Sequence, residues 1–288
     1  HTGMTILAGT SHSATIAFGD SGDNDIGQIG YDHGSNSLFF IANTTTVARL
    51  DGNSRISLSN NDAGGDGGTD GTSGNTLFGY LAGEDIADTG TNNTLIGHSA
   101  GKNITTGDNS VIIGGKAGDA TIDSSHHVLI GVSAGGNGDI ANDGTVAIGS
   151  SALYALTTGS GNTAVGYAAL DSEDTGNYNT AVGYNCLGAL NFDGDGYNTA
   201  VGYNTLLACS SGIENVAIGG NAGILLQTGD FNVIVGNGSG AGTVDVDNAV
   251  IIGCNAAQGV MTSAADGTVA IGKSALAALT TGAKNTGL

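Results

Sequence analysis

The sequence is poor in several residue types that globular enzymes use freely. Its 288 residues include no proline, no tryptophan and only 11% charged residues, a composition that argues against an ordinary enzyme. It also lacks a run of about 18 consecutive apolar residues, so we expect no insertion into a membrane. The first residues, HTGMTILAG, do not resemble a signal peptide, and the last, KNTGL, stop within a repeat. We therefore expect the chain to be a segment of a longer protein.

Positive charge and cysteine are scarce as well. Six Lys and Arg residues stand against 26 Asp and Glu residues, which gives a net charge of −20. Nucleic acids and anionic membranes attract Lys and Arg, so neither is expected as a partner. The three cysteines, Cys186, Cys209 and Cys254, are too few and too scattered for a disulfide framework or a zinc site. We expect all three to be small buried hydrophobic residues.

Glycine, by contrast, is abundant and periodic. The chain holds 53 glycines, and one of them follows an apolar triplet at intervals of 17 to 19 residues. A period of this length, sustained over twelve repeats, indicates a solenoid in which each repeat is one coil. The repeated glycines are Gly79, Gly97, Gly114, Gly131, Gly149, Gly166, Gly183, Gly202, Gly219, Gly236, Gly253 and Gly272.

The three residues before each repeated glycine predict a short β-strand. The last of them is Ile or Val in every repeat except the first, which has Phe78, and the first of them is Val or Thr. Residues two apart share one face of a strand, and we expect this β-branched face to point into the coil. The middle residue is apolar too, as in Leu95 and Ala147. Strands that are apolar on both faces are buried on both, so we expect other copies of the chain to cover the second face in a homotrimer.

The rest of each repeat predicts a corner, a second strand and a turn. The side chain three residues after the repeated glycine is small, as a tight corner requires. Apolar residues then recur where we expect a second short strand: Ile86, Ile104, Leu156, Leu190, Leu226 and Leu279. A further glycine, as in TTG at 157–159, supplies the positive φ of a turn. Stacked Asn side chains can form a hydrogen-bonded ladder, and Asn opens many coils: Asn75, Asn93, Asn162, Asn179, Asn198, Asn215 and Asn232.

These patterns predict an all-β protein in three parts. Residues 75–288 are expected to form a parallel β-solenoid or β-roll of about twelve coils of 17–19 residues, assembled as an intertwined or side-by-side homotrimer. Residues 1–60 contain short alternating segments such as ATIAFG and SLFFIA, which predict a small β-meander or β-sandwich. Residues 61–74 are rich in Gly and Asp, and we interpret them as a linker.

The repeat NTAVGYAAL–TTG–NTAVGY resembles the head repeats of trimeric autotransporter adhesins, which share its apolar–Ile–Gly–x–x–Ala core in shorter coils. The combination with the preceding segment, HTGMTILAGTSHSATIAFGDSGDNDIGQIGYDHGSNSLFF, is similar to bacteriophage tail fibres, especially marine ones. The likeness to tail fibres spans nearly the whole sequence. It implies a homotrimer that attaches to a host surface, and it implies no catalytic residues.

Candidate binding residues gather in three consecutive coils. Tyr167, Tyr184 and Tyr203 each follow a repeated glycine and should form an exposed aromatic stripe. Such stripes bind sugar faces, or they only stiffen a β ladder. The loop 191–197, with Phe192 and Tyr197, differs from its counterparts in length and chemistry, and loops on a rigid scaffold are common recognition elements. We expect receptor contacts at the stripe or at these loops; the alternative is a passive shaft.

Asp-rich loops are the only candidates for a cofactor. Asp193 and Asp195 could contribute carboxylate oxygens to a Ca²⁺ site, as could two Asp clusters in residues 20–25 and 62–70. None of these loops fits a known calcium-binding spacing, so solvated turns are the alternative. The histidines show no metal-binding spacing, and no nucleophile motif occurs.

We therefore expect a structural and attachment protein rather than an enzyme. It would be the shaft or head of a phage tail fibre, located on a virion tail or a cell surface. Its partners would be further copies of itself and a host cell-surface glycan or protein. The alternatives are the head of a bacterial trimeric surface adhesin and a glycan-cleaving tail spike.

Overall fold

The structure, a computed structural model, divides into two compact units at residues 1–77 and 78–288. It has no α-helix in the part of the chain that it describes, which confirms the predicted all-β class. The predicted linker 61–74 lies outside the described part except for Gly74. The described residues are 6, 8–19, 27–42, 45–50, 56–57, 74–87 and 89–288.

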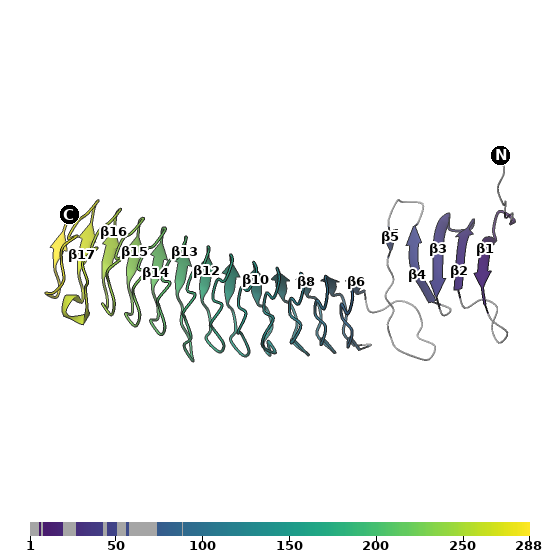
Figure 1. The fold of residues 1–288 in the computed structure, drawn as a ribbon, viewed down its shortest axis with the longest axis horizontal. Coiled ribbons are helices and arrows are strands. Elements are labelled where there is room, and N and C mark those ends of the chain that lie inside the picture. Colours follow the sequence, from purple (N-terminus) through teal and green to yellow (C-terminus); the bar gives the residue numbers. More distant parts are fainter. Residues whose placement is uncertain are drawn as a thin grey trace. The chain divides into compact units, whose positions relative to one another are not determined.

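The first unit is an antiparallel meander, as predicted (Figure 1). Its strands pair in chain order within one sheet, so it is not a sandwich. Ile16 pairs with Ile29, and Ile29 pairs with Phe40, which places one apolar row across three strands. The strands are β1 (Ser13–Phe18), β2 (Gly27–Asp32), β3 (Ser37–Ala42), β4 (Thr45–Leu50) and β5 (Ile56–Ser57).

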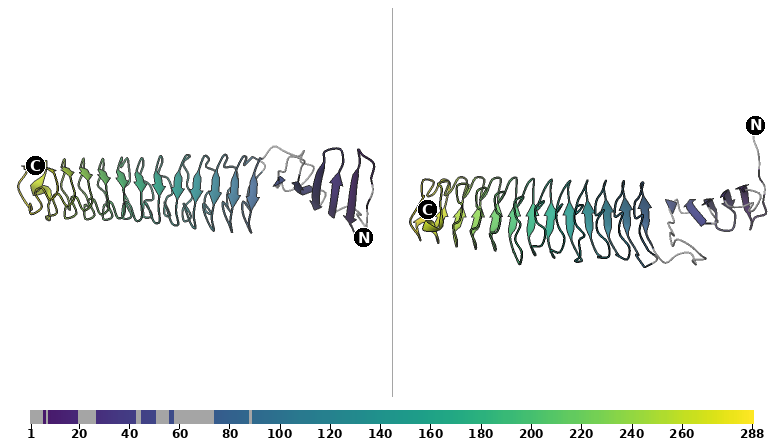
Figure 2. Two further views of the ribbon diagram at one scale, coloured as in Figure 1. Left: turned by 90° about the horizontal axis from the view of Figure 1, so that it is seen from above. Right: turned by 60° about the horizontal axis from the view of Figure 1, so that its bottom comes forward.

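The second unit is the predicted parallel β-solenoid. One short strand from each coil joins a 13-stranded sheet in strict chain order, and Figure 2 shows these strands side by side along the unit. Equivalent residues of neighbouring repeats pair, as Ala164 does with Ala181. The strands are β6 (Thr76–Phe78), β7 (Thr94–Ile96), β8 (Val111–Ile113), β9 (Val128–Ile130), β10 (Val146–Ile148), β11 (Thr163–Val165), β12 (Thr180–Val182), β13 (Thr199–Val201), β14 (Val216–Ile218), β15 (Val233–Val235), β16 (Val250–Ile252), β17 (Val269–Ile271) and β18 (Thr286–Gly287).

The two faces of these strands are the reverse of the prediction. In β11 the middle residue, Ala164, is fully buried, whereas Thr163 and Val165 are partly exposed. The middle residue is buried in every strand from β7 to β17. The expectation that the β-branched pair points into the coil is therefore wrong. Side chains from the corner and the turn also occupy the coil interior. Because the remaining space holds only one side chain from each strand, the flanking pair points outward.

The second strand of each coil is also absent. None of the six predicted positions lies in a strand. The amide of Ile104 donates to the carbonyl oxygen of Gly101 across a tight turn (3.2 Å), and Gly101 has a φ of +54°. Such a backbone cannot be extended. The side chains of Ile86, Ile104 and Leu156 are nevertheless buried, so this column contributes to the core without forming a strand.

Two columns of the coil interior have side-chain volumes that compensate each other. Where the middle strand residue is large, as at Leu95, the residue four after the repeated glycine is small, as at Gly101, and a Cβ there would lie 3.0 Å from Leu95 Cδ2. Where the middle residue is alanine, as at Ala181, the other position is leucine, as at Leu187, which is fully buried. The exception is Ala217, which is combined with Gly223. Leu187 has a φ of +51°, unusual for leucine. The same Ala–Leu pairing occurs at Ala147 with Leu153, Ala164 with Leu170, Ala200 with Leu206 and Ala270 with Leu276.

The repeated glycines are required by both the backbone and the packing. All twelve have φ between +122° and +143°, a region that side-chain-bearing residues rarely adopt. A Cβ on Gly166 would also lie 2.2 Å from the carbonyl oxygen of Gly183 in the next coil. The amide of Gly183 in turn donates to the carbonyl of Val165 (2.7 Å). The coils can therefore approach to hydrogen-bonding distance only because this column is glycine.

Candidate functional site

The predicted tyrosine stripe is a stacked ladder on the solenoid surface. The ring centroids of Tyr167 and Tyr184 lie 5.2 Å apart and those of Tyr184 and Tyr203 lie 5.4 Å apart, with interplanar angles of 13° and 19°. The three side chains are 46–55% exposed. Because neighbouring rings cover each other's faces, the ladder presents ring edges and hydroxyl groups to solvent. A sugar ring could stack on it only at the free faces of Tyr167 and Tyr203.

A second tyrosine pair stacks at the other end of the same strands. Tyr178 and Tyr197 have centroids 5.1 Å apart at an interplanar angle of 8°. Tyr178 was not among the predicted binding residues. Both residues directly precede the Asn that opens a coil, and this shared position was the signal in the sequence. In the chain, β12 therefore has a tyrosine of one stack before it, Tyr178, and a tyrosine of the other stack after it, Tyr184.

The predicted recognition loop, 191–197, is held by its own polar contacts. The hydroxyl of Thr175 donates to Asp193, Asn177 donates to Asp195 (3.1 Å), and the Tyr197 hydroxyl donates to the other oxygen of Asp195 (3.2 Å). The Phe192 side chain is half-buried. These contacts fix the loop to the preceding coil, so its side chains are presented on an ordered backbone.

The predicted calcium ligands are not gathered into a cation site. Within the described ranges, no group of three or more His, Cys, Asp or Glu side chains is placed to hold a metal ion. Asp193 and Asp195 accept the hydrogen bonds given above. The two Asp clusters in residues 20–25 and 62–70 lie outside the described residues.

The predicted asparagine ladder runs through the solenoid interior. The Oδ1 of Asn198 accepts hydrogen bonds from the amide and the Nδ2 of Asn215 (3.1 and 3.2 Å). The Nδ2 of Asn215 also donates to the carbonyl of Gly229 (2.8 Å). The same links connect Asn215 to Asn232, and both side chains are fully buried. Each asparagine thus joins two coils, and its buried polar atoms are satisfied.

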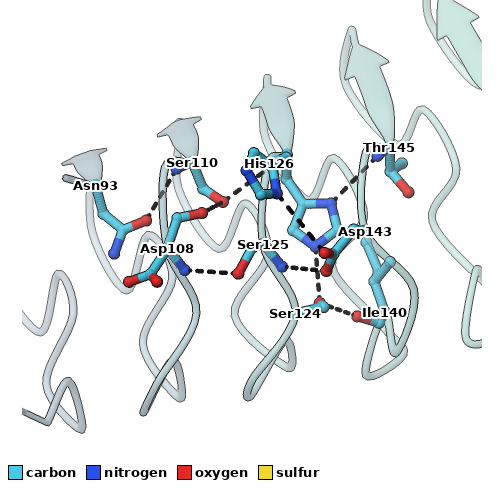
Figure 3. Close-up of polar contacts among 10 residues, drawn as sticks. Asn93, Asp108, Ser110, Ser124, Ser125, His126, Ile140, Asp143 and Thr145 are labelled. Atoms are coloured by element: carbon cyan, nitrogen blue, oxygen red, sulfur yellow. Dashed lines mark hydrogen bonds and ion pairs between the residues drawn. The ribbon is translucent and has the colours of Figure 1, made fainter. Parts of the chain in front are cut away.

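The ladder changes its chemistry between Asn93 and Asn162, where its positions are taken by Ser110, His127 and Thr145 (Figure 3). The Asn93 Oδ1 accepts from the Ser110 amide (3.0 Å), and the Ser110 hydroxyl oxygen accepts from the His127 amide (3.1 Å). The Nδ1 of His127 then accepts from the Thr145 amide (3.4 Å). Asn93, Ser110 and His127 thus each receive the amide of the next coil, whereas the Thr145 hydroxyl has no hydrogen-bond partner.

His127 also contacts Ser124 at a distance typical of a serine–histidine nucleophile pair, 2.7 Å between Nε2 and Oγ. Nδ1 accepts from a backbone amide, so the proton of the neutral imidazole resides on Nε2, which donates to Ser124. The Ser124 hydroxyl in turn donates to the carbonyl of Ile140. Burial lowers the pKa of His127 to about 4. The imidazole thus has no lone pair free for Ser124, and the pair is a structural contact.

Three other buried ionisable groups belong to the core. Glu173 is fully buried, and burial raises its pKa despite hydrogen bonds from the amides of Gly176 and Thr175. Cys186 and Cys209 are buried as predicted, and burial raises each thiol pKa to about 12. Cys254 is exposed, so its prediction as a buried residue is wrong; it occupies the surface column of Tyr184.

Across the described parts of both units, no helix is long and apolar enough to cross a membrane. Comparisons with protein-family models, with curated proteins and with solved structures find no match to this chain.

Proposed function

We propose that this chain is a structural, non-enzymatic attachment fibre of the phage tail-fibre type, assembled as a homotrimer. The observation that carries the proposal is the outward face of the solenoid strands. Its two columns consist of Val, Ile and Thr from β7 to β17 and contain no charged residue. Ile218 is 42% exposed and Ile271 is 39% exposed.

Other copies of the chain fit this face best. Soluble monomers rarely expose a long contiguous apolar surface, and such surfaces usually mark an interface. The face repeats once per strand along the 13-stranded sheet. A partner that packs along the whole length of this face must carry side chains at the same spacing as the strands. A second copy of this chain has that spacing because it has the same repeats. Three copies about one axis would cover each face.

The tyrosine ladders and the loop 191–197 support attachment to a surface glycan or protein. They place exposed aromatic rings, hydroxyl groups and carboxylates on neighbouring coils. The net charge of −20 favours a neutral or basic partner over an acidic polysaccharide. The lysines of the solenoid all lie on other coils: Lys102, Lys116, Lys273 and Lys284.

A glycan microarray tests the attachment role. We expect the wild-type chain to bind neutral oligosaccharides, and Tyr184→Ser combined with replacement of loop 191–197 by a short TTG turn to abolish binding. Tyr80→Ser is the matched control. Tyr80 lies in the same column and is 71% exposed, but it lies beside His98 on coils far from Tyr184. Equal binding by both variants, with their assembly unchanged, would favour a passive shaft.

A further inference from the structure

The polar column in the solenoid interior differs between two stretches of coils. From Asn162 to Asn232 the interior column is asparagine, whose side chains connect successive coils. In the preceding stretch the hydroxyl oxygens of Thr121 and Thr145 are buried without a hydrogen-bond partner. Unsatisfied buried groups lower the free energy needed to open a segment locally. Glu173, Asp174 and Asn204 leave similar unsatisfied atoms among the coils of the asparagine ladder. The coils around His127 therefore differ from these only in the residue at the asparagine position.

His127 adds a titratable group to this same stretch. It is fully buried, and both ring nitrogens are in use: Nε2 donates to Ser124 and Nδ1 accepts from the Thr145 amide. A proton can therefore be added only at Nδ1. Protonation would turn that nitrogen into a donor facing the Thr145 N–H, and it would place a positive charge in the coil interior. The side-chain hydrogen bond between this coil and the next would be lost, and only backbone bonds, such as that from the Val128 amide to the Thr145 carbonyl (2.9 Å), would join them there.

The charged groups around His127 do little to stabilise a cation there. The Asp143 carboxylate accepts from the Ser125 amide (2.7 Å), lies 3.7 Å from His126 Nδ1 and is 61% exposed. Solvent therefore weakens its attraction for His127. His126, next in the chain, carries like charge when protonated. The other carboxylates of this coil and its two neighbours lie toward the surface: Asp108, Asp119, Asp123 and Asp139.

We propose that His127 makes residues 108–145 an acid-sensitive seam, which opens on protonation of Nδ1 while the coils of the asparagine ladder stay closed. The imidazole replaces the asparagine amide as the acceptor for the next coil, and unlike the amide it loses this function in acid. The seam does not depend on the proposed attachment role.

The expected size of the pH effect follows from the pKa of His127 in the closed and the opened coil. The His127 pKa is about 4 in the folded coil and 6.5 in an opened one. Opening therefore takes up a proton, and the stability of these coils falls as the pH drops from about 6.5 to 4. The linkage relation makes opening about 30-fold more favourable at pH 5 than at pH 8.

Hydrogen exchange of the full chain, measured by mass spectrometry at pH 5 and pH 8, tests the seam against His127→Asn. Asparagine is the usual residue of this column, and its Oδ1 can accept from the Thr145 amide without titrating. The ratio of wild-type to variant exchange at each pH cancels the intrinsic pH dependence of the chemistry. We expect this ratio to rise about 30-fold from pH 8 to pH 5 in peptides from 108–145, and to stay constant in peptides from 179–232.

A ratio that is the same at both pH values, or one that rises equally along the solenoid, would overturn the proposal. A second measurement does not depend on the folding of the variant. Nuclear magnetic resonance of ¹³C-labelled histidine gives the titration of each imidazole in the wild-type chain. A buried histidine that titrates near pH 4 supports the seam, whereas titration of all histidines near pH 6.5 contradicts it.

Discussion

The repeated glycines combine two constraints in one residue, and three substitutions separate them. Gly166→Ala adds a Cβ at φ +142° and 2.2 Å from a carbonyl oxygen. Gly272→Ala meets only the torsional constraint, because φ is +122° but the nearest atom is 3.8 Å away. Gly115→Ala meets neither, since nothing lies within 4 Å.

Thermal unfolding should rank the three variants. Gly115→Ala should melt like wild type, and Gly272→Ala should lose about 1–3 kcal/mol from the torsion alone. Gly166→Ala should lose more, because neighbouring coils must also move apart. Equal melting temperatures for all three variants would show that the column does not set the distance between coils.

Glu173 is the residue whose chemistry fits its position least. It occupies the column of Leu156 and Leu190, its Oε2 is buried without a partner, and its pKa is raised by burial. A raised folded-state pKa means that the protonated form is favoured, so this group contributes most stability below pH 4.5 and loses it as the pH rises.

We therefore expect Glu173→Leu to raise the melting temperature at pH 7, by an amount equivalent to about 1–3 kcal/mol, and to change it little at pH 4. Thermal scans at both pH values measure this. Glu214→Gln removes the same charge from an exposed position and should have no effect. A Glu173→Leu variant that is less stable than wild type at pH 7 would indicate that the carboxylate has a compensating role.

Among the elements of the coil, the compensating columns give a test of packing. Ala181→Leu should overpack the interior and cost about 1–3 kcal/mol. Leu187→Gly should leave a cavity and cost about 2–5 kcal/mol. The double variant reproduces the combination seen at Leu95 and Gly101, so it should recover most of both losses. Purely additive losses in a double-mutant cycle would contradict the compensation.

The sequence predicted the existence and phase of the solenoid strands but not which face is buried. Period-two patterning marks two faces, and in β12 both Ala181 and the pair Thr180 and Val182 are compatible with an interior. Only the size of the interior decides between them. The Ala–Leu and Leu–Gly alternation between the two columns carried this information in the sequence. The absent second strand was missed because buried Leu and Ile positions in turns look like strand positions.

The candidate binding residues were predicted in part. The ladder of Tyr167, Tyr184 and Tyr203 followed from the repeat phase, because equivalent positions of successive coils must stack. Whether the rings present faces or edges depends on their tilt, which no sequence pattern gives. The role of His127 was missed because it occupies an asparagine position in a single coil.

For the whole molecule, the proposed assembly rests on the outward strand face. Val182→Glu places a charge in the middle of that face, on a partly exposed side chain. We expect the variant to keep the circular dichroism of a β-solenoid and to lose self-association, because a buried charge without a partner is costly. Thr158→Glu, in a loop, is the control and should assemble normally. If the Val182→Glu variant assembles normally, the interface between copies does not lie on this face.

The mass of the chain in solution tests the central proposal most directly. Sedimentation equilibrium at micromolar concentration should give a mass of about 84 kDa, three times the 28.0 kDa of one chain, independent of loading concentration. A stable species of 28.0 kDa under these conditions would contradict the fibre assembly, because the outward Val and Ile columns would then face water in the native protein.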